Sequence, residues 1–200
     1  MESDAEGKFS IDNVEPGRYW LSAERQGFVK MDYGARRPSG PGTVLTLEAG
    51  KDLTGLMFKL VPQGIIAGRV LDDEGEPLSG VMVQVLQQRY MQRRKRLVPA
   101  AAGVQTNDLG EYRVANLSPG EYKLFAWEDI EPGAAEDEEF RKPFESRRVD
   151  ASLDSGVRKS VQTPVILRLA VQEEKAKQKF CAENHMVRRG GLEPPRDCSR

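Results

Sequence analysis

Alternating apolar and polar residues predict short β-strands along most of this chain. In VMVQVLQ, residues 81–87, valine recurs at every second position, which places one strongly apolar face on a sheet. Clusters of turn-forming residues, such as DDEGEPLSG after residue 71, separate strands of this kind. The pattern predicts further strands at residues 8–11, 18–24, 43–47, 56–61, 61–71, 111–114, 121–128 and 161–169.

Proline and charge modify this pattern in the second half of the chain. Pro164 lies within the predicted strand 161–169. Because proline cannot donate to a central ladder, we expect that strand to lie at a sheet edge or a bulge. An acidic stretch predicts one short helix around residues 136–144, and AVQEEKAKQKF, residues 170–180, fits a second.

The tail has a different character from the rest of the chain. Residues 181–200 lack periodicity and are rich in glycine, proline and arginine, so we predict that they are disordered. A second interpretation is read-through or mis-framed translation, because VRRGGLEPPRDCSR resembles the ends of many unrelated reading frames. We therefore treat residues 170–200 as a short helix and a disordered tail.

One phrase occurs twice. DAEGKFSIDNVEPGRYWLSA, residues 4–23, aligns without a gap to NDLGEYRVANLSPGEYKLFA, residues 107–126. A repeat of domain length predicts tandem copies of one module. The recurring pairs are Gly7 and Gly110, Asn13 and Asn116, Pro16 and Pro119, Gly17 and Gly120, Tyr19 and Tyr122, Leu21 and Leu124, and Ala23 and Ala126.

The two copies differ in completeness. Residues 61–169 contain every predicted strand of a module, whereas residues 1–60 contain only the later strands. We expect the missing strands to precede Met1, so that the first module is truncated at its N-terminus. A sandwich without two strands has open edges and half a core, so residues 1–60 are expected to be poorly packed.

Composition excludes several broad classes of protein. Hydrophobic residues make up 38% and charged residues 30% of the 200 residues, and the net charge is −1, so no overall field favours nucleic acid. No apolar run approaches the ~20 residues that a transmembrane helix needs. The N-terminus shows no signal peptide, and the two cysteines, Cys181 and Cys198, both lie in the tail.

The residue content argues against catalysis, cofactors and metals. Hydrolytic zinc sites and nucleophilic triads need histidine, and the one histidine, His185, lies in the tail. There is no P-loop and no dinucleotide-binding motif. The acidic cluster at residues 72–76 lacks the ligand spacing of a calcium loop, so a solvated turn is the preferred interpretation.

A basic segment is the strongest charge feature. RYMQRRKR, residues 89–96, has the composition of a site for phosphate, an acidic glycan or nucleic acid, with an aromatic ring for stacking. The preferred alternative is an exposed hairpin tip that faces the acidic segment 136–139. The candidate contact residues in this segment are Tyr90, Arg93, Arg94, Lys95 and Arg96.

The two tryptophans are the other candidate ligand contacts. Trp20 and Trp127 each lie on the opposite face from the tyrosine, leucine and alanine of the repeated phrase. Exposed tryptophans on a β-sandwich serve as platforms for sugars. Contact with a neighbouring repeat is an equally good alternative.

The second copy contains two motif-like stretches, GRVLDDEGEPLSGVMVQV at residues 68–85 and TNDLGEYRVANLSPGEYKLFA at residues 106–126. Together they resemble the carboxypeptidase regulatory-like domain family, which overlaps with Cna-B-type and transthyretin-like modules. The resemblance covers residues 64–126 and implies an all-β fold of tandem prealbumin-like Greek-key β-sandwich modules. It does not imply catalysis, because the zinc site of a carboxypeptidase lies in another domain. The matching residues are Gly68, Val70, Asp72, Gly75, Pro77, Gly80, Val81, Val83, Thr106, Gly110, Tyr112, Leu117, Pro119, Gly120, Tyr122 and Leu124.

The resemblance implies a non-catalytic spacer or a binding and assembly unit of a bacterial cell-envelope or secreted protein. Its expected partners are neighbouring repeats or domains, a glycan or another envelope protein, and no nucleic acid is expected. One alternative is a carbohydrate-binding module. Another is an accessory domain that regulates a linked enzyme outside this sequence. Some Cna-B-like modules form lysine–asparagine isopeptide links, but no buried triad for this reaction follows from the spacing.

Overall fold

The chain folds into two compact units. The computed structural model describes residues 2–91 and 94–187, and the chain divides into residues 1–62 and residues 63–200. The fold is mostly β, as the alternating pattern predicted, and nearly all of the regular structure lies in the second unit.

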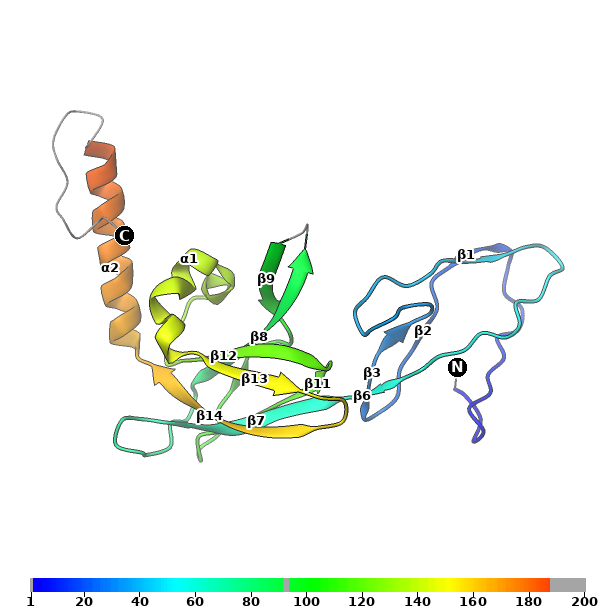
Figure 1. Ribbon diagram of the computed structural model, residues 1–200, viewed down its shortest axis with the longest axis horizontal. Coiled ribbons are helices and arrows are strands. Elements are labelled where there is room, and N and C mark those ends of the chain that lie inside the picture. The colour runs from blue at the N-terminus through cyan, green and yellow to red at the C-terminus, as the bar shows by residue number, and fades with distance from the viewer. Residues whose placement is uncertain (1, 92–93, 188–200) are drawn as a thin grey trace. The chain divides into compact units, whose positions relative to one another are not determined.

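The second unit is built on a curled sheet (Figure 1). The strand order is β10-β8-β12-β14-β7-β11, with β13 added to β12 and β9 added to β8. Most pairs are antiparallel, but β14 runs parallel to both β7 and β12. The strands are β7 (Gly64–Leu71), β8 (Met82–Met91), β9 (Arg94–Pro99), β10 (Val104–Gln105), β11 (Glu111–Leu117), β12 (Gly120–Trp127), β13 (Val149–Leu153) and β14 (Arg158–Ile166).

One apolar core fills the inside of the curl. Alternate residues of β7, β11 and β14 pack there against alternate residues of β8, β12 and β13, which is the arrangement of a β-sandwich. Val83, Val85 and Leu124 are completely or almost completely buried, as expected from the alternation that predicted these strands. Each such side chain contributes roughly 1.5–3 kcal/mol by leaving water.

Helical segments cover the outer face of this sheet. They are η1 (Ala134–Glu136), α1 (Glu138–Arg141) and η2 (Lys142–Arg147). The long helix α2 (Arg168–Val187) joins this cover through Val171 in its first turn. Asp137 begins α1, and its carboxylate accepts a hydrogen bond from the Glu139 backbone N–H. The short helix expected in the acidic segment is thus confirmed. The second helix continues past residue 180 to Val187, and residues 188–200 of the predicted disordered tail lie outside the described residues.

Pro164 does not lie on an edge strand. β14 is flanked by β7 and β12, so the expectation of a sheet edge is wrong. Pro164 is opposite Leu71 at the last pair of the β7 ladder, and the next residue, Val165, is paired with β12 instead. The proline therefore marks the point where β14 changes partners, a position at which a missing N–H is tolerated.

The first unit has little regular structure. Its strands span two or three residues and form three separate antiparallel pairs. Residues 8–11 form no strand, so that prediction is wrong, and residues 56–60 form none before β6. Pairs this short bury little surface on their own. The strands are β1 (Gly17–Tyr19), β2 (Ser22–Ala23), β3 (Phe28–Val29), β4 (Met31–Asp32), β5 (Leu45–Leu47) and β6 (Val61–Pro62).

Burial of Tyr122 makes the second unit sensitive to alkaline pH. Burial raises the pKa of Tyr122 to about 12, so the folded state holds the phenolic proton more tightly than the unfolded state does. The free energy of unfolding should therefore fall by about 1–2 kcal/mol as pH rises from about 10 to about 12, after allowance for solvent screening. Urea unfolding across this range should show a weaker pH dependence for Tyr122→Phe. An unchanged dependence would contradict the assignment.

Candidate functional site

The two tryptophans lie in opposite environments. Trp20 is 69% exposed in the first unit, so its proposed role in sugar contact stays a prediction. Trp127 is 0% exposed, and the expectation that it is available to a ligand is wrong. The reason is that its ring packs against Phe125, Phe140 and Phe144, beneath the helical cover of the sheet.

The basic segment forms a hairpin from β8 and β9. Tyr90 is exposed, and the Lys95 ammonium lies 5.7 Å from the centre of its ring, within the range of a cation–π contact. Arg93 lies outside the described residues, and Arg94 begins β9. Lys95 and Arg96 line a cleft together with Glu138 and Glu139, so the expectation that this hairpin faces the acidic segment is confirmed.

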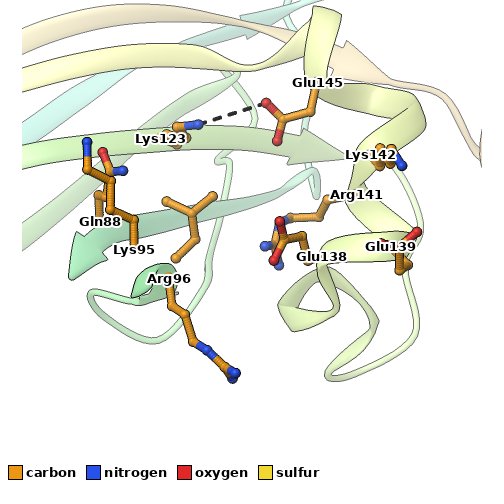
Figure 2. Close-up of a pocket in the computed structure, with 10 residues that line it drawn as sticks. Gln88, Lys95, Arg96, Lys123, Glu138, Glu139, Arg141, Lys142 and Glu145 are labelled. Atoms are coloured by element: carbon orange, nitrogen blue, oxygen red, sulfur yellow. Dashed lines mark ion pairs between the residues drawn. The ribbon is translucent and has the colours of Figure 1, made fainter. Parts of the chain in front are cut away.

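This cleft is the candidate site of the second unit. It lies between the hairpin and the α1–η2 segment, above β12, and has a volume of about 350 Å³. Figure 2 shows Gln88, Lys95 and Arg96 on the hairpin side and the residues of α1 and η2 opposite them. Its basic lining residues are Lys95, Arg96, Lys123, Arg141 and Lys142, and its acidic ones are Glu138, Glu139 and Glu145.

The alternation of β12 places Lys123 at the base of the cleft. Tyr122 and Leu124 point into the core, so Lys123 shares the outer face with Phe125 and Trp127. Its ammonium is 3.9 Å from the Glu145 carboxylate (Figure 2), but Glu145 also accepts a hydrogen bond from Arg148. Burial and the nearby Arg148 guanidinium lower the pKa of Lys123, because both disfavour the ammonium form.

Arg141 is the most deeply buried charge in the site. Only 3% of its surface is exposed, and its Nη1 donates to the Ala135 carbonyl over 2.6 Å. Its Nε has no hydrogen-bond partner among the residues that the structure describes. Burial lowers the pKa of Arg141, whereas the carboxylates of Glu138 and Asp137 act in the opposite direction. A guanidinium stays protonated in such a setting and keeps its donors available to an acceptor.

Other clusters of charge have structural roles. The carboxylate of Asp72 accepts hydrogen bonds from the backbone N–H groups of Glu74 and Glu76, which closes the turn after β7 as expected. Within residues 2–91 and 94–187, no three histidine, cysteine, aspartate or glutamate residues are grouped to hold a metal ion. None of the described helices is both long and apolar enough to cross a membrane.

Comparison with known proteins connects the second unit to a family. Residues 65–136 match the family model of the carboxypeptidase regulatory-like domain. The match overlaps the stretch that carries the motif and confirms that resemblance. The matched region spans β7 to β12 and includes the hairpin side of the cleft. No curated protein matches the chain.

Solved structures show weaker likeness. The Streptococcal ancillary pilin is 14% identical, with a TM-score of 0.35 over 78% of this chain and 46% of that chain. A variant of BcpA, the major pilin subunit of Bacillus cereus, is 12% identical, with a TM-score of 0.33 over 50% of this chain and 28% of that chain. Catechol 1,2-dioxygenase from Acinetobacter sp. ADP1, inhibited by bound mercury, is 11% identical, with a TM-score of 0.30 over 58% and 54%.

The chain spans about half or less of the length of each of these structures. At such low TM-scores, neither the pilins nor the dioxygenase carries an argument about this chain.

Proposed function

We propose that this chain is a non-catalytic structural unit that acts as a spacer or assembly element between neighbouring domains. Residues 63–169 form one module, and residues 1–62 contain the later strands of a second module of the same kind. The recurrence of the repeated phrase carries this proposal, because several of its residues have the same structural task in both units.

The first shared feature is a turn that a side-chain oxygen closes by accepting backbone hydrogen bonds. The Asn107 side-chain oxygen accepts hydrogen bonds from the backbone N–H groups of Leu109 and Glu111, and Asp4 accepts the corresponding bonds from Glu6 and Lys8. In each turn the glycine three residues later has a positive φ, which favours glycine. The same geometry in both copies of the phrase supports a common module.

The second shared feature is the corner around the Pro-Gly pair, where an asparagine before it and a tyrosine after it have the same local geometry in both copies. Asn13 and Asn116 have φ values of 58° and 57°, a left-handed conformation that asparagine tolerates better than most residues. The Tyr19 hydroxyl donates to the Glu15 carbonyl, and the Tyr122 hydroxyl donates to the Ser118 carbonyl. This is the tyrosine-corner arrangement of β-sandwiches, in which a hydroxyl anchors a strand to the preceding loop.

The two units differ in the strands and side chains that surround the shared turn and tyrosine corner. β12 pairs with β13 on one side and with β8 on the other, whereas β1 pairs with β5 alone. Tyr122 is buried, but Tyr19 is 37% exposed. Within residues 2–62, Val29 and Met31 are the only buried apolar side chains. These differences support the interpretation that the first unit lacks counterparts of β7 and β8.

The family resemblance also supports an extracytoplasmic setting, in the cell envelope or outside the cell. Neighbouring repeats or domains of a longer protein are then the expected partners. Because folds of this class carry many functions, the proposal rests on the tasks of the recurring residues and not on the architecture alone.

A fusion tests the proposal directly. A copy of residues 63–103 placed immediately before Met1 continues the repeat register and supplies the missing strands to the first unit. We expect the fused chain to show a larger urea m-value than the parent, because more surface becomes buried on folding. Amide exchange in the Arg18–Glu24 segment should become slow at the same time.

A matched control keeps the length and the turns of the fusion. In this control, the three core valines of the added copy, Val81, Val83 and Val85, are replaced by serine, which removes its apolar face. The control should behave like the parent chain. Equal m-values and equal exchange for the two fusions would contradict a second module.

A further inference from the structure

We propose that the cleft between the β8–β9 hairpin and the α1–η2 segment binds an oxyanion, a phosphate or carboxylate group carried by a small hydroxylated molecule. This inference goes beyond the structural role proposed above and does not depend on it.

The charges that line the cleft are incompletely neutralised. Five cationic residues line the cleft, against three acidic ones. Of these carboxylates, Glu145 is already bonded to Arg148, which lies outside the lining. Lys123 therefore keeps only a long contact to Glu145. A bound anion would supply the missing counter-charge at the base of the cleft.

Arg141 provides a donor that is held in place before any ligand arrives. Its Nη1 is fixed by the Ala135 carbonyl, and the side chain is almost fully buried. A buried N–H without an acceptor costs free energy, about 1–3 kcal/mol for a typical group. An oxyanion accepts several hydrogen bonds and forms shorter, stronger ones with a guanidinium than with neutral donors. The positive charge of Arg141, which lines the cleft, thus favours an anionic ligand there.

The size of the cleft and its acidic rim indicate the rest of the ligand. A volume of about 350 Å³ exceeds what a bare phosphate fills and lies within the range of small-molecule pockets. Glu138 and Glu139 line the helical side, where their carboxylates can accept hydrogen bonds from ligand hydroxyls. The same carboxylates repel a continuous run of negative charge. The cleft therefore suits one compact anion better than nucleic acid or a sulfated polysaccharide.

Isothermal titration calorimetry and amide chemical-shift mapping of the full chain test the proposal, with inorganic phosphate, glucuronate and glucose as probes. We expect saturable binding of phosphate or glucuronate, with shifts at Lys95, Lys123 and Arg141, and no binding of glucose. Binding of phosphate alone indicates a phosphorylated ligand, and binding of glucuronate alone indicates an acidic sugar. Saturable binding of glucose with equal affinity, or of no probe at millimolar concentration, would overturn the proposal.

Two variants locate the binding. Lys123→Gln should weaken the affinity by about tenfold, the usual loss for one charge-assisted hydrogen bond. Lys177→Gln removes the same charge from the exposed side of α2 and should change affinity by less than about twofold. Unchanged thermal unfolding of both variants establishes that each is folded. Equal weakening by the two would show diffuse attraction to a charged surface and would reject the cleft.

Discussion

Replacing Trp127 with alanine is expected to lower the free energy of unfolding by about 3–5 kcal/mol, the range observed for large aromatic truncations in cores. The indole is completely buried between β12 and the helical cover. It stacks on Phe125 with ring centroids 5.7 Å apart and meets Phe144 edge-on at 5.2 Å. Loss of the ring therefore removes both transfer energy and the contact that joins the sheet to the α1–η2 segment.

Trp20→Ala is the matched control. Trp20 lies in the first copy of the repeat, at a nearby but different place that aligns with Lys123, and is 69% exposed. Its removal should therefore change stability by less than about 0.5 kcal/mol. Urea unfolding followed by far-ultraviolet circular dichroism measures both changes. Equal effects would contradict the burial that distinguishes the two tryptophans.

Replacing Gly68 with alanine is expected to cost about 3 kcal/mol or more, because no space exists for a methyl group. A Cβ at this position would lie 1.7 Å from the Val161 backbone oxygen and 2.8 Å from the Tyr112 hydroxyl. Neither neighbour is free to move. The Val161 carbonyl belongs to β14, which pairs with β7 here, and it accepts a hydrogen bond from Tyr112.

Gly75→Ala separates this steric effect from the conformational preference of glycine. Gly75 has a φ of 87° in the turn after β7, and nothing lies within 4 Å of the place that an alanine methyl group would take. Its replacement should cost about 1 kcal/mol, from backbone strain alone. Denaturant midpoints of the two variants provide the comparison. A Gly68→Ala variant as stable as Gly75→Ala would show that β7 and β14 are not packed this closely.

Local sequence patterns predicted much of the second unit, because the features that they predicted depend on residues close together in the sequence. The alternation of valines located β8, and the Pro-Gly pair with its tyrosine located the corner before β12. Asp72 and Asn107 close turns through bonds to backbone groups two and four residues away. Side-chain chemistry of this range is visible in the sequence itself.

Features that depend on distant segments were not predictable in the same way. Alternation assigned Trp127 to the outer face of β12, but it does not reveal that residues 134–147 fold back over that face. The parallel pairing of β14 with β7 joins residues some ninety positions apart, a relation that local periodicity does not report. By contrast, β13 has an alternating signal in VDASL that the sequence interpretation missed.

The candidate cleft was predicted in part. Charge alone identified Lys95 and Arg96 and their acidic neighbours, since a run of like charges is conspicuous. Lys123 and Arg141 were missed because each is a single cation, one within a strand and one within a short acidic helix. The available signal was the position of Lys123 on the same face as Phe125 and Trp127, which becomes informative only when the cover of that face is known.

We propose that the repeated phrase belongs to one kind of module, which is complete in residues 63–169 and incomplete in residues 1–62. Amide hydrogen exchange of the full chain tests this most directly, because Gly17–Glu24 and Gly120–Trp127 are matched segments of one molecule. We predict slow exchange in the β12 segment, which is hydrogen-bonded to strands on both sides, and exchange near the unprotected rate from Gly17 to Glu24. Equally slow exchange in both segments would contradict the proposal.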